Sequence, residues 1–256
     1  MSWKRNIKHT LSNVFSLYNI ISGPRTGFRI LMYHSISKGV QDDPDGIFTV
    51  TKNLFSNHMD ILENDKKLNL VSLEQGVNNI DKKLIKVSVT FDDGFADNLY
   101  VVAPIMLKQQ IPFTVFVVSD FVKNNVEEYL NRKELYELSQ FPRVTIGSHG
   151  ASHTPLNQLN DYQLKEELSS SKKYIEDITG KLVNAISFPH GAIDSRIKDY
   201  AINAGYSIGG TSRFNINKNH QDPIFLARNV ILSYDNEKIF KQKLYGSCDW
   251  YSLISS

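Results

Sequence analysis

The chain has 256 residues, of which 41% are hydrophobic and 22% are charged, and this composition excludes a disordered or fibrous protein. Its formal net charge of +2 gives no sign of a nucleic-acid partner. Cys248 is the only cysteine, so an intrachain disulfide and a zinc site built from thiolates are both excluded. Any bound metal must therefore use histidine and carboxylate side chains.

The first segment, residues 1–23, has the pattern of an amphipathic helix. Its apolar residues recur at helical spacing with basic residues between them: Trp3, Ile7, Leu11, Val14, Phe15, Tyr18 and Ile21. Polar residues interrupt the apolar run and no small-residue cleavage site follows it, which disfavours an export signal. The helix is expected either to pack on the domain or to anchor residues 1–22 peripherally to an anionic membrane surface. We therefore expect a cytoplasmic protein, free or at the inner face of the membrane, with export as the alternative.

From residue 24 to residue 256 the chain alternates short β-branched and aromatic runs with longer segments of helical periodicity. This pattern is typical of repeated βα units within a single domain. The expected strands are residues 28–34, 85–91, 113–119, 143–149, 184–190, 206–212 and 225–231, and the expected helices are residues 51–65, 96–110, 127–140, 160–180 and 195–205. Pro104 should kink or break the second helix. Seven apolar strands with crossover helices favour a parallel sheet that closes, or nearly closes, into a barrel.

Histidines gather at the expected carboxyl ends of these strands. Of the seven in the chain, four lie at or just beyond such an end: His34, His149, His153 and His190. In a barrel these ends meet at one mouth, so residues far apart in the sequence can share a site. A single histidine there is more simply a hydrogen-bonded strand-end residue, and it is the clustering that indicates a site. The turn-rich loop of residues 37–46 follows the first strand and belongs to the same face.

The segment IGSHGASHTPL sets His149 and His153 four residues apart just after a strand, and at this spacing both imidazoles can bind one ion. Zinc proteases with a related pattern need a glutamate after the first histidine. Position 150 is glycine, so a protease of that kind is excluded. Any general base must come from another strand.

The segment TFDDG places Asp92 and Asp93 side by side at the end of a strand. Two such carboxylates raise each other's pKa unless a cation or a proton-transfer role accounts for them. Asp93 with the two histidines of the preceding segment would form a set of two imidazoles and one carboxylate that leaves positions open for water and substrate. Asp92 then remains as a general base. Capping of the following helix is the alternative, and it explains one of the two carboxylates.

Three segments together resemble the metal-dependent polysaccharide deacetylases of carbohydrate esterase family four: TFDDG (90–94), SHGASH (148–153) and FPHG (188–191). The resemblance covers roughly residues 30–231 and implies a single-domain distorted (β/α)7 barrel of the α/β class. It implies Asp92 as the catalytic base and Asp93, His149 and His153 as the metal ligands. The ligand set suits Zn²⁺ and tolerates Co²⁺, Ni²⁺, Mn²⁺ or Fe²⁺.

The chain departs from the family pattern in the source of its catalytic acid. The usual C-terminal Leu-x-His motif is absent, because no histidine follows His220. The segment ILMYHSI (30–36) instead resembles the opening motif of a circularly permuted branch that includes deacetylases of poly-N-acetylglucosamine. That likeness implies His34 as the acid. The arginine that usually precedes the third motif is also missing, and Arg228 is expected to orient Asp92 in its place.

The expected function is the removal of N-acetyl groups from N-acetylhexosamine residues of a bacterial polysaccharide or lipid-linked glycan. By the resemblance, Pro189 and His190 bind the substrate, with the backbone N–H of His190 at the oxyanion. Tyr33, Phe48 and Trp250 are candidates to stack on sugar rings, although buried aromatic side chains are commoner. The alternatives are an O-acetyl esterase acting on glycans and a catalytically silent glycan-binding module, and the complete set of catalytic residues speaks against the silent module.

Overall fold

The structure is a computed structural model, and it describes residues 26–37, 39–41, 43–78 and 84–250. The amphipathic helix expected over residues 1–23, with its peripheral membrane contact, lies outside these residues. Among the helices that are described, none is long and apolar enough to cross a lipid bilayer.

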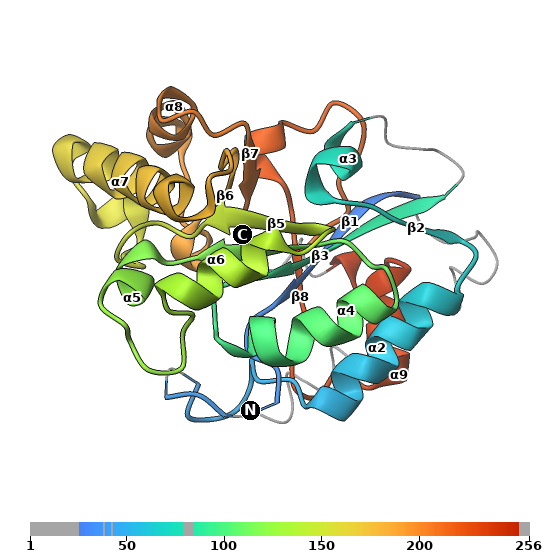
Figure 1. Cartoon of the computed structure of the whole chain (residues 1–256). Helices are drawn as coiled ribbons and strands as arrows, with labels where there is room; N and C mark the ends of the chain where they lie inside the picture. The colour runs from blue at the N-terminus through green and yellow to red at the C-terminus, as the bar shows by residue number, and fades with distance from the viewer. Residues whose placement is uncertain (1–25, 38, 42, 79–83, 251–256) are drawn as a thin grey trace.

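A parallel sheet of eight strands forms the centre of the molecule (Figure 1). Its strands lie in the order β7-β6-β5-β4-β3-β1-β8, and β2 pairs with β3 beside this path. The strands are β1 (Gly27–Tyr33), β2 (Leu68–Leu70), β3 (Ile85–Phe91), β4 (Phe113–Val117), β5 (Val144–Ser148), β6 (Ala185–Ser187), β7 (Ile208–Gly210) and β8 (Asn229–Val230). All seven expected strands are present, most of them shorter than the sequence pattern suggests.

The sheet curls until its two ends meet. Leu31 of β1 pairs with Asn229 of β8, and Gly210 at the end of β7 forms a parallel bridge to Leu226, shortly before β8. The chain leading into β8 therefore contacts the strand at the opposite end of the sheet order. Because β8 has only two residues, few backbone pairs close the barrel. The expected single-domain distorted (β/α)7 barrel is confirmed.

Strand β2 was not expected from the sequence. It has three residues, none of them buried, so it lacks the apolar run that marks the other strands. It pairs with the first part of β3, at Ile85 to Val87, whereas β4 pairs with the last part, at Val89 to Phe91. The two strands thus pair with different parts of the same edge of β3, and β2 does not add a separate strand to the barrel.

Helices lie around the outside of the curled sheet (Figure 1). They are α2 (Lys52–Asn64), α3 (Leu73–Val77), α4 (Ala103–Lys108), α5 (Ser119–Lys123), α6 (Arg132–Gln140), α7 (Asp161–Thr179), α8 (Ser195–Asn203) and α9 (Glu237–Leu244), with short turns at η1 (Asn98–Val102), η2 (Leu156–Gln158), η3 (Pro189–Gly191) and η4 (Pro223–Phe225). The five expected helices correspond to α2, η1 with α4, α6, α7 and α8. The sequence analysis missed α3, α5 and α9, each of which has eight residues or fewer.

The expected irregularity at Pro104 is confirmed. The π-helical turn η1 ends at Val102, and Pro104 occupies the second position of α4. Proline has no backbone N–H and its ring clashes with the carbonyl four residues earlier, so it is tolerated in the first turn of a helix and disruptive in the interior. The change from π-helix to α-helix just before Pro104 places the ring where it is tolerated.

The alternation of side chains along β1 divides the core into two clusters. Leu31 and Tyr33 belong to the large cluster that includes residues of the outer helices, such as Phe55 of α2. Phe28 and Ile30 belong to a smaller cluster formed mainly by strand residues. Because successive strand residues point to opposite faces, odd positions of β1 face the helices and even positions face the barrel interior.

Gly147 of β5 allows a close approach to the interior cluster. A Cβ atom added there would lie 2.5 Å from the Phe116 ring and 3.1 Å from the Ala185 carbonyl oxygen. Phe116 is fully buried and has no room to move, so Gly147→Ala should lower the free energy of unfolding by about 1–3 kcal/mol.

Urea unfolding measures this loss. The matched control is Gly39→Ala, because a Cβ atom at Gly39 would meet nothing within 4 Å, and its free energy of unfolding should stay within about 1 kcal/mol of the parent value. Equal losses in the two variants would contradict this account of β5 packing.

Candidate active site

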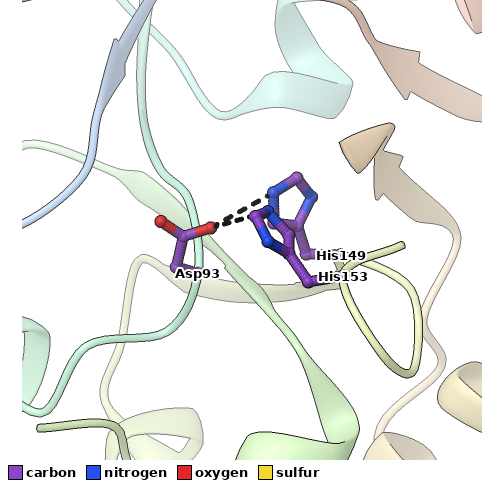
Figure 2. Close-up of side chains that lie close together, drawn as sticks. All are labelled: Asp93, His149 and His153. Carbon is purple, nitrogen blue, oxygen red and sulfur yellow. Dashed lines mark ion pairs between the residues drawn. The ribbon is translucent and has the colours of Figure 1, made fainter. Parts of the chain in front are cut away.

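The carboxyl ends of β3 and β5 bring three side chains to one point. Asp93 follows β3, and His149 and His153 follow β5. Figure 2 shows the Asp93 carboxylate facing both imidazole rings. Its Oδ1 atom lies 3.3 Å from Nε2 of His149 and 3.4 Å from Nε2 of His153. The three ligand atoms lie within 4.8 Å of one another.

Unusual backbone conformations hold two of these residues. Asp93 and His153 have φ values of 72° and 64°, a region that costs a non-glycine residue about 1–3 kcal/mol. Such strain is typical of functional sites, where the surrounding structure holds it in place. Glu167 of α7 fixes the loop between His149 and His153, because its Oε1 accepts hydrogen bonds from the N–H groups of Ala151 at 2.8 Å and Ser152 at 2.7 Å.

The site fits a divalent cation. Nδ1 of His149 lies 2.7 Å from the Ser187 carbonyl oxygen, and since a carbonyl only accepts, Nδ1 carries the proton and Nε2 is left as a donor atom for a metal. Oδ1 of Asp93 is buried and has no hydrogen-bond partner among the described residues. A buried carboxylate oxygen without a partner is costly, and a cation held by Asp93, His149 and His153 would satisfy it.

The two histidines differ in ionisation, and that of His153 suits a metal site. Burial, followed by the charge of His149, lowers the pKa of His153 to about 4, so its ring is neutral near pH 7. Burial alone would lower the pKa of His149, but the carboxylates of Asp92 and Asp93 raise it above its ordinary value. A proton therefore competes with a cation for Nε2 of His149.

Asp92 lies beside the ligand set and is held by Arg228. Arg228 donates to Oδ1 of Asp92 at 2.7 Å and to Oδ2 at 2.8 Å, and the Ser187 hydroxyl donates to Oδ2 at 3.0 Å. Oδ2 is 4.0 Å from Nε2 of His149. Burial by itself would raise the pKa of Asp92, but the Arg228 guanidinium, together with His149 and His34, outweighs it and holds the pKa well below its ordinary range. The carboxylate is therefore ionised at neutral pH.

His34 reaches the same mouth from the end of β1. It lines a cavity of about 50 Å³ together with Asp93 and Phe48, and its ring centroid is 4.9 Å from that of Phe48. Nδ1 of His34 is buried and lacks a hydrogen-bond partner within the described part of the chain. His190 is exposed, with a φ of 57° and a ring centroid 4.8 Å from that of His153, whereas Pro189 is buried.

Tyr33 does not reach the mouth, and the expectation that it contacts a sugar is wrong. Its side chain has no exposed surface and packs against Phe55 and Phe91, while its hydroxyl lies 3.0 Å from Nδ1 of His58. Tyr33 occupies an odd position of β1 and faces the helices, whereas the next residue, His34, faces the interior.

Trp250 is also placed away from the mouth. The residue before it, Asp249, pairs with Arg29, which lies near the amino end of β1. The carboxyl ends of the strands, where the histidines gather, are at the opposite side of the barrel.

Comparison with known proteins identifies the family to which this arrangement belongs. The sequence model of the polysaccharide deacetylase family matches residues 79–209, just over half of the chain. The chain belongs to the polysaccharide deacetylase family. The family expected from the three sequence segments is thereby confirmed.

Named relatives agree with this assignment. This chain is 30% identical over 186 residues to the Bacillus subtilis (strain 168) protein YxkH, named as a polysaccharide deacetylase, and the match covers 72% of this chain and 63% of that relative. It is 26% identical to a solved polysaccharide deacetylase from Bacillus cereus, with a TM-score of 0.74 over 85% of this chain and 68% of that chain.

The fold is shared more widely. The Streptococcus pyogenes deacetylase PplD, solved in complex with acetate, has a TM-score of 0.76, with 23% identity over 86% of this chain and 99% of that chain. At this level of identity the likeness concerns the fold alone.

Sequence reasoning missed two residues that support this site. Ser187 uses its carbonyl to orient His149 and its hydroxyl to bind Asp92. Glu167 holds the loop between the two histidines. A serine ending a short strand and a glutamate within a helix are common, so their residue types carried no signal. Their roles depend on contacts between residues far apart in the sequence: Ser187 is 38 residues from His149, and Glu167 is 16 residues from Ala151.

Proposed function

We propose that this chain is a metal-dependent deacetylase that hydrolyses the N-acetyl groups of N-acetylhexosamine residues in a bacterial polysaccharide or a lipid-linked glycan. The observation that carries the proposal is the meeting of Asp93, His149 and His153 at one point, beside an ionised Asp92. A catalytically silent glycan-binding module has no use for this combination of ligand set and held carboxylate.

The ligand set favours Zn²⁺, and Co²⁺, Ni²⁺, Mn²⁺ and Fe²⁺ also accept two imidazoles and one carboxylate. When bound, the cation polarises the acetyl carbonyl and lowers the pKa of a water molecule towards neutrality. Asp93, His149 and His153 are the residues that would hold it. Ser187 keeps His149 in the tautomer that leaves Nε2 available.

Asp92 is the general base in this proposal and takes the proton of the attacking water. Its low pKa makes it a weak base by itself, so it depends on a water whose own pKa is lowered. Among the described residues Oδ1 accepts from Arg228 alone, and a carboxylate oxygen has two acceptor sites. One lone pair of Oδ1 therefore remains for the proton that is transferred.

His34 is the general acid and donates a proton to the sugar amine as the C–N bond breaks. His34 lines one cavity with Asp93, and this shared cavity supports a common role for the acid and the ligand set. The backbone N–H of His190 is a donor for the oxyanion of the tetrahedral intermediate. Donors of this kind contribute about 10²–10³-fold to kcat in other hydrolases.

Removal of the cation tests the proposal. Dialysis against a chelator should abolish acetate release from N-acetylglucosamine oligomers, and stoichiometric Zn²⁺ should restore it. His153→Ala should lower both metal content and kcat/KM by at least about 100-fold, because even the outer partners of metal ligands are worth 10–100-fold. The matched control is His220→Ala, at a histidine that is exposed and separate from the ligand set.

Metal-free protein that still releases acetate at the parent rate would overturn the metal-dependent mechanism. Parallel assays on O-acetylated sugars distinguish an esterase from an amidase. A kcat/KM for O-acetylated sugars above that for N-acetylated ones would replace the proposed substrate with an ester.

A further inference from the structure

An aromatic ring stands exposed at the mouth of the barrel, on the loop that follows β1. The side chain of Phe48 is 41% exposed, and its ring leans on His34 at a centroid distance of 4.9 Å with an interplanar angle of 55°. A single exposed aromatic side chain is ordinary at a protein surface. Phe48, however, contacts His34, which is the proton donor in the proposed function.

The exposure of Phe48 does not result from a loose loop. The buried Asp43 carboxylate accepts hydrogen bonds from the N–H groups of Ile47, Phe48 and Thr49 and from the Thr49 hydroxyl, each at 2.8 Å. A carboxylate that accepts several hydrogen bonds fixes the backbone around it. Asp43 therefore holds the Phe48 backbone in one position, with the ring directed to solvent and His34.

The other side of the loop is also held. Oδ2 of Asp97 accepts hydrogen bonds from the Ser35 hydroxyl at 2.8 Å and from the Ile36 N–H at 2.7 Å. Ile36 in turn forms a parallel bridge with Val50. The residues on either side of the loop are thus fixed to each other, and the contact between the rings of His34 and Phe48 is preset.

The cavity beside these rings is too small for a whole sugar. Its volume is about 50 Å³, and it lies among His34, Phe48 and Asp93. A space of that size holds a few water-sized groups, such as the acetamido substituent, and the hexose ring must remain outside. The amine that His34 would protonate is attached directly to that ring, so the ring lies within reach of Phe48.

We propose that the Phe48 ring is the platform on which the apolar C–H face of the hexose ring packs, and that Asp43 is its positioning residue. The inference rests on the proposed function, because it uses His34 as the proton donor to the sugar amine. Binding pockets commonly place aromatic side chains against the apolar surface of a ligand, and a few polar groups then fix the orientation of the ligand.

Kinetics on N-acetylglucosamine oligomers test the platform. Phe48→Leu keeps an apolar side chain and removes the flat ring, and it should raise KM about tenfold, which corresponds to about 1.4 kcal/mol of lost contact. Phe48→Tyr keeps the ring and should retain KM within about twofold. The matched control is Tyr136→Leu, at an aromatic side chain of α6 that is 52% exposed. A KM for Phe48→Leu equal to that of the parent would overturn the platform.

The positioning role of Asp43 is tested by a double-mutant cycle. Asparagine cannot replace a carboxylate that accepts four hydrogen bonds, so Asp43→Asn should raise KM in the parent protein. In the Phe48→Leu background it should raise KM no further, because the platform on which it acts is already gone. Fully additive effects would show that Asp43 acts through something other than Phe48.

Direct binding separates this inference from the proposed function. Saturation-transfer NMR with the same oligomers should show sugar protons in contact with the parent protein and a weaker signal with Phe48→Leu. If the parent binds in this way but releases no acetate, the proposed reaction is wrong and the platform stands. If the parent releases acetate and Phe48→Leu keeps the full signal, the platform is wrong and the reaction stands. Loss of both signal and acetate release in the parent overturns both.

Discussion

Replacing Asp92 by asparagine is expected to leave the cation bound and to lower kcat by about 10³-fold, within the range that a positioned general base contributes. The amide has the shape of the carboxylate but cannot take a proton from water. The three proposed metal ligands do not include Asp92, so metal content should stay near that of the parent. Acetate release under saturating substrate, together with metal analysis of the same samples, measures both quantities.

Stability has to be followed in the same variant. The introduced amide would face the buried Arg228 guanidinium without a negative charge, and a buried charge that loses its partner costs about 3–5 kcal/mol. Assays must therefore be run well below the unfolding temperature. Asp199→Asn, at an exposed aspartate of α8, is the matched control and should change neither activity nor stability. Turnover by Asp92→Asn within tenfold of the parent would refute its assignment as the base.

Replacing Arg228 by methionine is expected to lower the free energy of unfolding by about 3–5 kcal/mol near pH 7, because Asp92 is then a buried carboxylate without its cationic partner. Urea unfolding measures the loss. The matched control is Arg196→Met. Arg196 pairs with the exposed Asp161 at 2.9 Å, and an ion pair at the surface contributes about 0–1 kcal/mol. Similar losses in the two variants would contradict the role given to the buried pair.

The loss in Arg228→Met should depend on pH with a defined sign. In the parent the folded-state pKa of Asp92 is depressed, so its contribution is present above the unfolded value of about 3.9 and is lost as the pH falls through the folded value. Without Arg228, burial raises the pKa of Asp92, and the variant becomes relatively more stable as protons are added. The difference between the two proteins should be largest near neutral pH and should shrink as the pH falls, beginning above the unfolded value of about 3.9, because the raised folded pKa of the variant is reached first.

Activity of Arg228→Met should fall as well, and its acid limb should move to higher pH. Asp92 would be protonated at a pH where the parent still has it ionised. A pH profile of kcat/KM that is lower but unshifted would mean that Arg228 acts through stability alone and does not set the ionisation of Asp92.

Local sequence patterns predicted much of the fold, because the interactions that begin and end a helix involve residues close together in the sequence, and a buried strand is marked by the types of its own residues. Helix α7 begins after Asn160, whose side chain accepts from the Gln163 N–H, and ends at Gly180 with a φ of 67°. Both residue types are common at such ends. The longest strands, β1 and β3, are buried at every position and appeared in the sequence as runs rich in β-branched and aromatic residues. The short elements β2, α3 and α5 have too few residues to show a period.

The sequence by itself determined which residues stand at strand ends, and therefore that Asp92, Asp93, His149 and His153 share one mouth, because parallel strands of a barrel all end on the same side. Only the tertiary structure decided that Tyr33 faces the helices, that Ser187 orients both a histidine and an aspartate, and that Asp43 holds Phe48. Asp92 and its partner Arg228 are separated by 136 residues. Which side chains meet over such separations depends on how strands and helices pack, and no local period records it.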